Sequence, residues 1–167
     1  TQTARVVALN LRGVFLLADT GRYYPRYELG AHVLGFVDLD NKGQGGVEYA
    51  YDKAVRGKDG LAFVRVDARQ QRLESRIERA PVPGAKLELT IDLYLQHILE
   101  RELKAGVEAN RAKSGTAIIM DPASGEILAL ASYPTFNPNS AGRHPADERR
   151  NRAVQDVYEP GSTFKIV

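Results

Sequence analysis

Residues 86–131 carry the patterns that most restrict what this chain can fold into. Residues 86–91 alternate apolar and polar side chains, which predicts a half-buried strand. Asp92 follows and can cap a long helix by accepting hydrogen bonds from its first free amides. The apolar positions of that helix recur at helical spacing, at Leu95, Ile98, Leu99, Leu103 and Val107. Two apolar runs, 116–120 and 127–131, then flank a turn and predict a β-hairpin. Strand, helix and hairpin in this order indicate an α+β domain.

The part of the chain before Pro81-Val82-Pro83-Gly84 has shorter and weaker patterns. We predict strands at residues 6–9, 14–18, 61–66 and 73–79, and short helices within residues 30–37 and 47–55. A dense cluster of turn residues separates the two helices. We therefore place a domain boundary at the Pro-Gly seam. A small mixed domain covers residues 1–84, and the opening part of a second domain, a sheet flanked by helices, covers residues 85–167.

The composition argues against several classes of function. The 167 residues suffice for one medium domain, or for a small domain and part of another. The formal net charge is only +2, which gives no sign of nucleic-acid binding. Cysteine is absent, which excludes disulfides and thiolate metal sites. No apolar run reaches the roughly 20 residues that span a bilayer. The chain opens on Thr1 rather than on a methionine, so we expect upstream sequence to be missing.

The patterns that could hold a metal or a phosphate do not fit either ligand. Asp38, Asp40 and Gly43 imitate the start of a calcium loop. Lys42, however, occupies a ligand position, and Tyr49 stands where the bidentate glutamate belongs. The glycine cluster nearby lacks the strand and the spacing of a phosphate loop. The three histidines are too far apart in the sequence for a metal site and are interpreted as surface or packing residues: His32, His97 and His144. We predict neither a metal nor a cofactor.

Ser162 and Lys165 form a Ser-x-x-Lys tetrad directly after Pro160-Gly161. Residues three apart lie on one face of a helix, and the Pro-Gly pair places the serine in the first turn. Free amides and the positive end of the helix dipole favour negative charge on oxygen there. A lysine whose pKa is lowered by its surroundings can take the serine proton and create a nucleophile. The alternative is that Ser162 only caps the helix and Lys165 lies on a solvated face.

The chain resembles the class B penicillin-binding proteins along nearly its whole length. The blocks that resemble the membrane-proximal pedestal of this family are Arg22-Tyr23-Tyr24-Pro25, residues 31–36, Gly45-Gly46-Val47-Glu48, Tyr51-Asp52 and residues 57–60. Those that resemble the start of its transpeptidase domain are residues 89–92, Leu95-Gln96, residues 120–122 and 125–129, residues 133–139, residues 150–153 and residues 158–165. So many blocks in the family's order make the resemblance specific.

The resemblance implies a peptidoglycan D,D-transpeptidase that is a target of penicillin. Ser162 would be the acylated nucleophile and Lys165 the general base that activates it. The substrate would be a stem peptide ending in D-Ala-D-Ala, β-lactams would be inhibitors, and a membrane glycosyltransferase would be a partner. The block 31–36 and the acidic turn after it resemble the division type and its sporulation relatives, which implies a role in septal wall synthesis. The family is bitopic, with one helix in the bacterial inner membrane and an extracytoplasmic body.

Three alternatives stay open. The elongation type of the family is close to the division type. The chain could instead be a non-catalytic module that contacts a glycosyltransferase through residues 1–81. A β-lactam sensor or β-lactamase shares the tetrad, although the pedestal blocks argue against it. The family's Ser-x-Asn and Lys-Thr-Gly motifs, which follow the tetrad, are not in this sequence. We therefore expect these 167 residues to be a piece of a longer protein and inactive by themselves.

Overall fold

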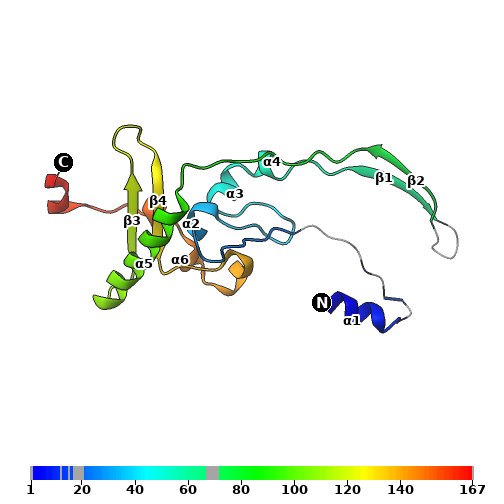
Figure 1. The fold of residues 1–167 in the computed structure, drawn as a ribbon, viewed down its shortest axis with the longest axis horizontal. Coiled ribbons are helices and arrows are strands. Elements are labelled where there is room, and N and C mark those ends of the chain that lie inside the picture. The colour runs from blue at the N-terminus through cyan, green and yellow to red at the C-terminus, as the bar shows by residue number, and fades with distance from the viewer. Residues whose placement is uncertain (1, 12, 15, 17–20, 67–71, 167) are drawn as a thin grey trace.

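The computed structural model describes residues 2–11, 13–14, 16, 21–66 and 72–166. The described chain is elongated (Figure 1). A central body holds helices and a β-hairpin, and a second hairpin extends from the body as a long arm. Helix α1 (Gln2–Ala8) and the C-terminal 3-10 helix η2 (Gly161–Ile166) lie at opposite ends, away from the body.

Short helices form the first part of the body. Helix α2 (Ala31–Leu34) and the pair α3 (Gly46–Ala50) and α4 (Asp52–Val55) confirm the helices predicted within 30–37 and 47–55. Tyr51 interrupts the second of them, at φ −114° and ψ 17°. Gly35 ends the α2 segment at φ 80°, and a Cβ there would collide with the carbonyl group of Gly45. Glycine is therefore required where these two turns meet.

The arm is an antiparallel pair of strands, β1 (Leu61–Val66) and β2 (Arg72–Arg79), which confirms both predicted strands. Phe63 lies opposite Arg76 in the register, and the side chains of both are exposed. A bridge between Lys58 and Val82 continues the pairing toward the body. The hairpin thus begins in the body and extends into solvent (Figure 1).

Two predicted strands are wrong. Residues 6–9 fall mainly in α1, because no strand in the described part of the chain pairs with them and a local helix satisfies their backbone instead. Residues 86–91 form no strand, although they alternate in polarity, and Leu87 and Leu89 remain partly exposed. The backbone there is tied at single points, such as the hydrogen bond from Thr90 Oγ1 to the carbonyl of Ile127 at 2.7 Å. The strand predicted at 14–18 lies largely outside the described residues.

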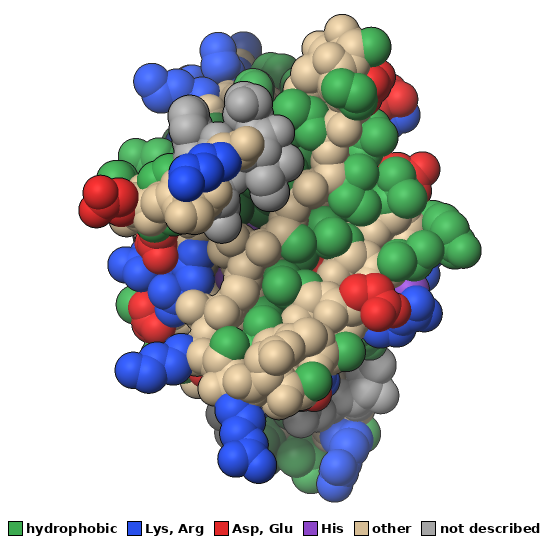
Figure 2. Space-filling view, turned by 90° about the vertical axis from the view of Figure 1, so that its left-hand side faces the viewer, with side chains coloured by type: hydrophobic (Ala, Val, Ile, Leu, Met, Phe, Trp, Pro, Cys, Tyr) green, Lys and Arg blue, Asp and Glu red, His purple; other side chains and the backbone are tan. Residues whose placement is uncertain are grey.

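The helix and the hairpin between residues 92 and 133 follow the prediction closely, whereas the expected loop after them contains short helices. The Asp92 carboxylate accepts hydrogen bonds from the amides of Tyr94 and Leu95 at 2.8 and 2.9 Å and so caps α5 (Leu93–Ala109). Strands β3 (Gly115–Met120) and β4 (Ile127–Tyr133) form the predicted antiparallel hairpin. Helix α5 packs against this hairpin (Figure 1). The other broad side of the hairpin carries a band of hydrophobic side chains at the surface (Figure 2).

The chain after β4 returns to the first part of the body before it reaches the serine motif. It passes through η1 (Pro138–Arg143), α6 (Ala146–Arg149) and α7 (Arg152–Gln155). Phe136 is only 1% exposed and forms the centre of the core with Ala31 and Ala141, while Phe36 packs at its edge. Among the described residues, no helix is long and apolar enough to cross a membrane.

Candidate active site and its support

Ser162 and Lys165 lie in η2, which is a 3-10 helix and not the expected α-helix. Side chains three apart eclipse each other in a 3-10 helix, so the two residues still share one side. Gly161 begins the turn at φ 54°, a conformation that favours glycine. Both side chains are exposed, and among the described residues no hydrogen bond or ion pair holds either of them. The tetrad is therefore presented at the surface, and its two functional groups are not joined.

The segment that leads to the tetrad is fixed by a buried aromatic cluster. Phe136 meets the rings of His32 and Phe36 edge to face, with centroids at 5.3 and 5.8 Å. The ring of His144 lies at 6.3 Å on another side. His32 and Phe36 come from the first half of the chain, and Phe136 and His144 from the second. The cluster therefore joins the two halves next to the path to Ser162.

Asn139 ties the same segment to the backbone of Tyr24. Its Oδ1 accepts a hydrogen bond from the Tyr24 amide at 2.9 Å, and its Nδ2 donates to the Tyr24 carbonyl at 2.9 Å. One side chain thus satisfies both backbone groups of a residue 115 positions earlier in the sequence. The Tyr24 side chain is buried beside Glu48, and its burial raises the pKa of the phenol.

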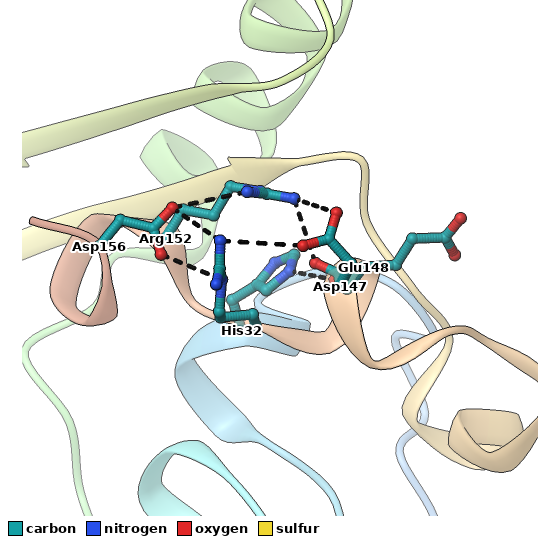
Figure 3. Close-up of polar contacts among 6 residues, drawn as sticks. His32, Asp147, Glu148, Arg152 and Asp156 are labelled. Carbon is teal, nitrogen blue, oxygen red and sulfur yellow. Dashed lines mark hydrogen bonds and ion pairs between the residues drawn. The ribbon is translucent and has the colours of Figure 1, made fainter. Parts of the chain in front are cut away.

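His32 makes the corresponding contacts to α6 and α7 (Figure 3). Its Nε2 lies 2.8 Å from the carbonyl oxygen of Glu148, and its own carbonyl accepts a hydrogen bond from Asn151 Nδ2 at 3.2 Å. The side chain is buried, and burial lowers the pKa of the imidazole. A neutral ring that donates from Nε2 fits this environment.

Ion pairs connect α6, α7 and the residue that follows α7, just before the segment that leads to η2 (Figure 3). The guanidinium of Arg152 lies 2.5 Å from the Asp147 carboxylate and 3.5 Å from that of Asp156. Arg150 Nε lies 3.0 Å from Asp156 as well. Asp156 is thereby held by two arginines, only six residues before Ser162.

Gln96 links α5 to the hairpin, because its side-chain amide bonds both backbone groups of one β4 residue, as a neighbouring strand would. Its Oε1 accepts from the Leu130 amide at 2.9 Å, and its Nε2 donates to the Leu130 carbonyl at 2.8 Å. Nε2 also donates to Glu100 at 2.7 Å, and Glu100 in turn accepts from the amide of Gly30 at 2.8 Å. Burial raises the pKa of the Glu100 carboxyl. The chain of contacts thus runs from the pedestal-like region to β4.

No sequence pattern predicts a role for Asn139, Asn151, Gln96 or Glu100. Asn139, Gln96 and Asn151 stand in the blocks that carry the family resemblance, which was the signal available for them. The three histidines were interpreted as surface or packing residues: His32 is buried, His144 is half-buried beside Glu148, and His97 is exposed. In the described part of the chain, no three acidic or histidine side chains come together as metal ligands.

Comparisons with known proteins match most of the chain to one family. A family model described as "Penicillin-binding Protein dimerisation domain" matches residues 2–89. A second, "Penicillin binding protein transpeptidase domain", matches residues 115–167. The "Probable peptidoglycan D,D-transpeptidase PenA" of Neisseria meningitidis serogroup A is 40% identical over 163 residues, covering 96% of this chain and 28% of that protein. The "Peptidoglycan D,D-transpeptidase FtsI" of Escherichia coli K12 is 40% identical over 157 residues, covering 94% of this chain and 27% of that protein.

A solved structure is similar as well. The crystal structure of penicillin binding protein 3 from Mycobacterium tuberculosis superposes with a TM-score of 0.71 at 31% identity. The match covers 86% of this chain and 29% of that one. The chain therefore spans little more than a quarter of the length of the proteins that it resembles.

Proposed function

This chain belongs to the class B penicillin-binding proteins, and from that premise we propose that the protein of which it is part is a peptidoglycan D,D-transpeptidase. The observation that carries the proposal is the Ser162 and Lys165 pair, three residues apart in a 3-10 helix that Gly161 begins. The pair lies within the residues that match the transpeptidase domain. Its exposure leaves the serine hydroxyl accessible to a substrate.

The proposed reaction is acyl transfer through serine. The Lys165 amine takes the proton of Ser162, whose oxygen attacks the carbonyl carbon of the D-Ala-D-Ala bond. The carbon–nitrogen bond breaks, and the terminal D-Ala leaves with a proton on its amine. The amine of a second stem peptide then attacks the ester, forms the cross-link and restores the serine hydroxyl. A β-lactam enters at the first step and stays as a stable acyl-enzyme.

The other parts of the proposal concern the whole protein. We assign residues 1–84 to the pedestal and residues 85–167 to the start of the transpeptidase domain, and the contacts of Asn139 and His32 support a rigid junction between them. The 40% identity to FtsI supports a role in septal wall synthesis. We further propose a single membrane anchor, an extracytoplasmic body and a glycosyltransferase partner, as the family resemblance implies.

The test is covalent labelling of the full-length protein with a fluorescent penicillin. We expect the intact mass to rise by one β-lactam and the label to map to Ser162. Ser162→Ala should abolish the increment, whereas the control Ser124→Ala, in the exposed hairpin turn, should label like the wild type. Labelling that survives Ser162→Ala would place the nucleophile elsewhere. A full-length protein that never labels would leave only the non-catalytic module.

A further inference from the structure

A groove of about 670 Å³ lies between the pedestal-like region and the η1 segment. One wall comes from residues 21–24 and 36–41, the other from residues 138–143, and Arg149 lies beside them. We call it the basic groove and define it by Arg22, Tyr24, Phe36, Leu39, Arg143 and Arg149. A cavity of this size can hold several side chains of a peptide and is larger than a simple ion requires.

Two of the arginines in the basic groove have no carboxylate partner. In the described part of the chain, neither Arg143 nor Arg149 makes an ion pair. The next arginines of the same segment behave differently, because Arg150 and Arg152 both pair with Asp156. Cations that outnumber the carboxylates along a concave surface concentrate anions there.

The remaining charges around the basic groove are already satisfied. Arg22 Nε lies 2.9 Å from the Glu48 carboxylate. The Asp38 carboxylate accepts hydrogen bonds from the amides of Asp40 and Lys42, each at 2.9 Å, and from Gln44 Nε2 at 2.9 Å. These hydrogen bonds lower the pKa of Asp38 and keep it ionised. Asp38 therefore stays negative at the edge of the groove, but Arg143 and Arg149 together outnumber it and leave the groove with a net positive charge.

The floor and rim of the basic groove are apolar. The Phe36 ring lies beneath the guanidinium of Arg149 at 5.1 Å, and Tyr24 and Ala141 are buried around it. Leu39 is fully exposed at the rim and extends this apolar surface. An anion alone would leave this apolar surface in water. The groove thus offers two guanidiniums beside an apolar floor, which suits a ligand that is both acidic and apolar.

We propose that the basic groove binds an extended acidic segment of another protein. Carboxylates of that segment pair with Arg143 and Arg149, and an apolar side chain covers Phe36 and Leu39. Guanidinium and carboxylate match in shape and charge, which provides the specificity. A bilayer surface is flat and cannot reach a concave floor, so a peptide fits better than lipid headgroups. This inference does not depend on the transpeptidase activity.

The test is fluorescence anisotropy with the full-length protein and a labelled peptide of alternating Glu and Leu residues. We expect saturable binding that weakens with salt, and an affinity loss of about tenfold for Arg143→Glu and more for Arg143→Glu with Arg149→Glu. Arg143→Glu alone covers the case in which loss of the Arg149–Phe36 contact unfolds the protein. The control Arg101→Glu reverses an exposed arginine of α5, outside the groove, and should bind like the wild type.

Four results would overturn the proposal. The first is the absence of binding, and the second is that a peptide of alternating Lys and Leu residues binds with the same affinity. The third is that Arg101→Glu loses as much affinity as Arg143→Glu. The fourth is that anionic lipid vesicles bind through the two arginines and the acidic peptide does not. Labelling by fluorescent penicillin is measured on every variant. It is expected to remain, so that a failed groove and a failed serine site are told apart.

Discussion

Replacement of Gln96 by methionine isolates the contribution of a single side chain that joins α5 to β4. Methionine has nearly the same volume as glutamine, so Gln96→Met leaves no cavity. It removes the hydrogen bonds to both backbone groups of Leu130, which are 2.8 and 2.9 Å long. Gln96 and Leu130 are 1% and 6% exposed, so water does not replace these bonds.

A buried backbone group that loses its partner costs about 1–2 kcal/mol, so the two groups of Leu130 together cost about 2–4 kcal/mol. Because tenfold in an equilibrium corresponds to about 1.4 kcal/mol, opening of β4 should become about 30-fold to 1,000-fold more frequent. Hydrogen exchange of peptides that cover residues 127–133 in the full-length protein measures this opening directly.

The control Gln155→Met changes an exposed glutamine in α7 and should leave the exchange of these peptides unchanged. The exchange of the β1–β2 arm should also be unchanged in Gln96→Met, since the arm lies away from α5 (Figure 1). Wild-type exchange of residues 127–133 in Gln96→Met would refute the reasoning, because it would mean that the bonds to Leu130 do not hold the strand.

Further predictions concern the junction and the tetrad. Burial lowers the pKa of His32, so near pH 6.5 the imidazole of the unfolded chain takes up a proton and that of the folded chain does not. The free energy of unfolding in urea should therefore fall as the pH drops below about 6.5. The fall should be smaller in His32→Gln. Burial raises the pKa of Glu100, so the protonated carboxyl stabilises the fold below about pH 4.5 and this stabilisation is lost as the pH rises. Glu100→Gln should therefore unfold at a higher urea concentration than the wild type at neutral pH. An unchanged urea midpoint would contradict this. Phe136→Ala should destabilise the fold by about 3–5 kcal/mol in the same assay, and a loss below about 1 kcal/mol would show that the cluster is not the core. Lys165→Arg should slow penicillin acylation by about a thousandfold with an unchanged circular dichroism spectrum, and near-normal acylation would remove Lys165 as the base.

Local sequence patterns predicted an element correctly where a short stretch of sequence is enough to specify its secondary structure. The Asp92 cap, the 17-residue α5 and the β3–β4 hairpin need only a capping carboxylate, helical apolar spacing and a turn. Residues 86–91 failed because alternation predicts a strand only where a neighbouring strand supplies the hydrogen bonds. Residues 6–9 failed for the same reason, and a local helix replaced the expected strand.

The sequence by itself determined the tetrad, the helix cap, the hairpin and the family. Each of them can be recognised from neighbouring residues or from the order of short sequence blocks. Only the tertiary structure decided that Asn139 holds Tyr24 and that His32 holds Glu148, across separations of 115 and 116 residues. The sequence around a polar side chain does not identify a distant hydrogen-bond partner. The partner depends on which backbone groups the packing of the fold brings within reach. The exposed position of Ser162 is decided in the same way, by where the chain runs after Phe136 has been buried. So is the lack of ion pairs at Arg143 and Arg149 within the described residues.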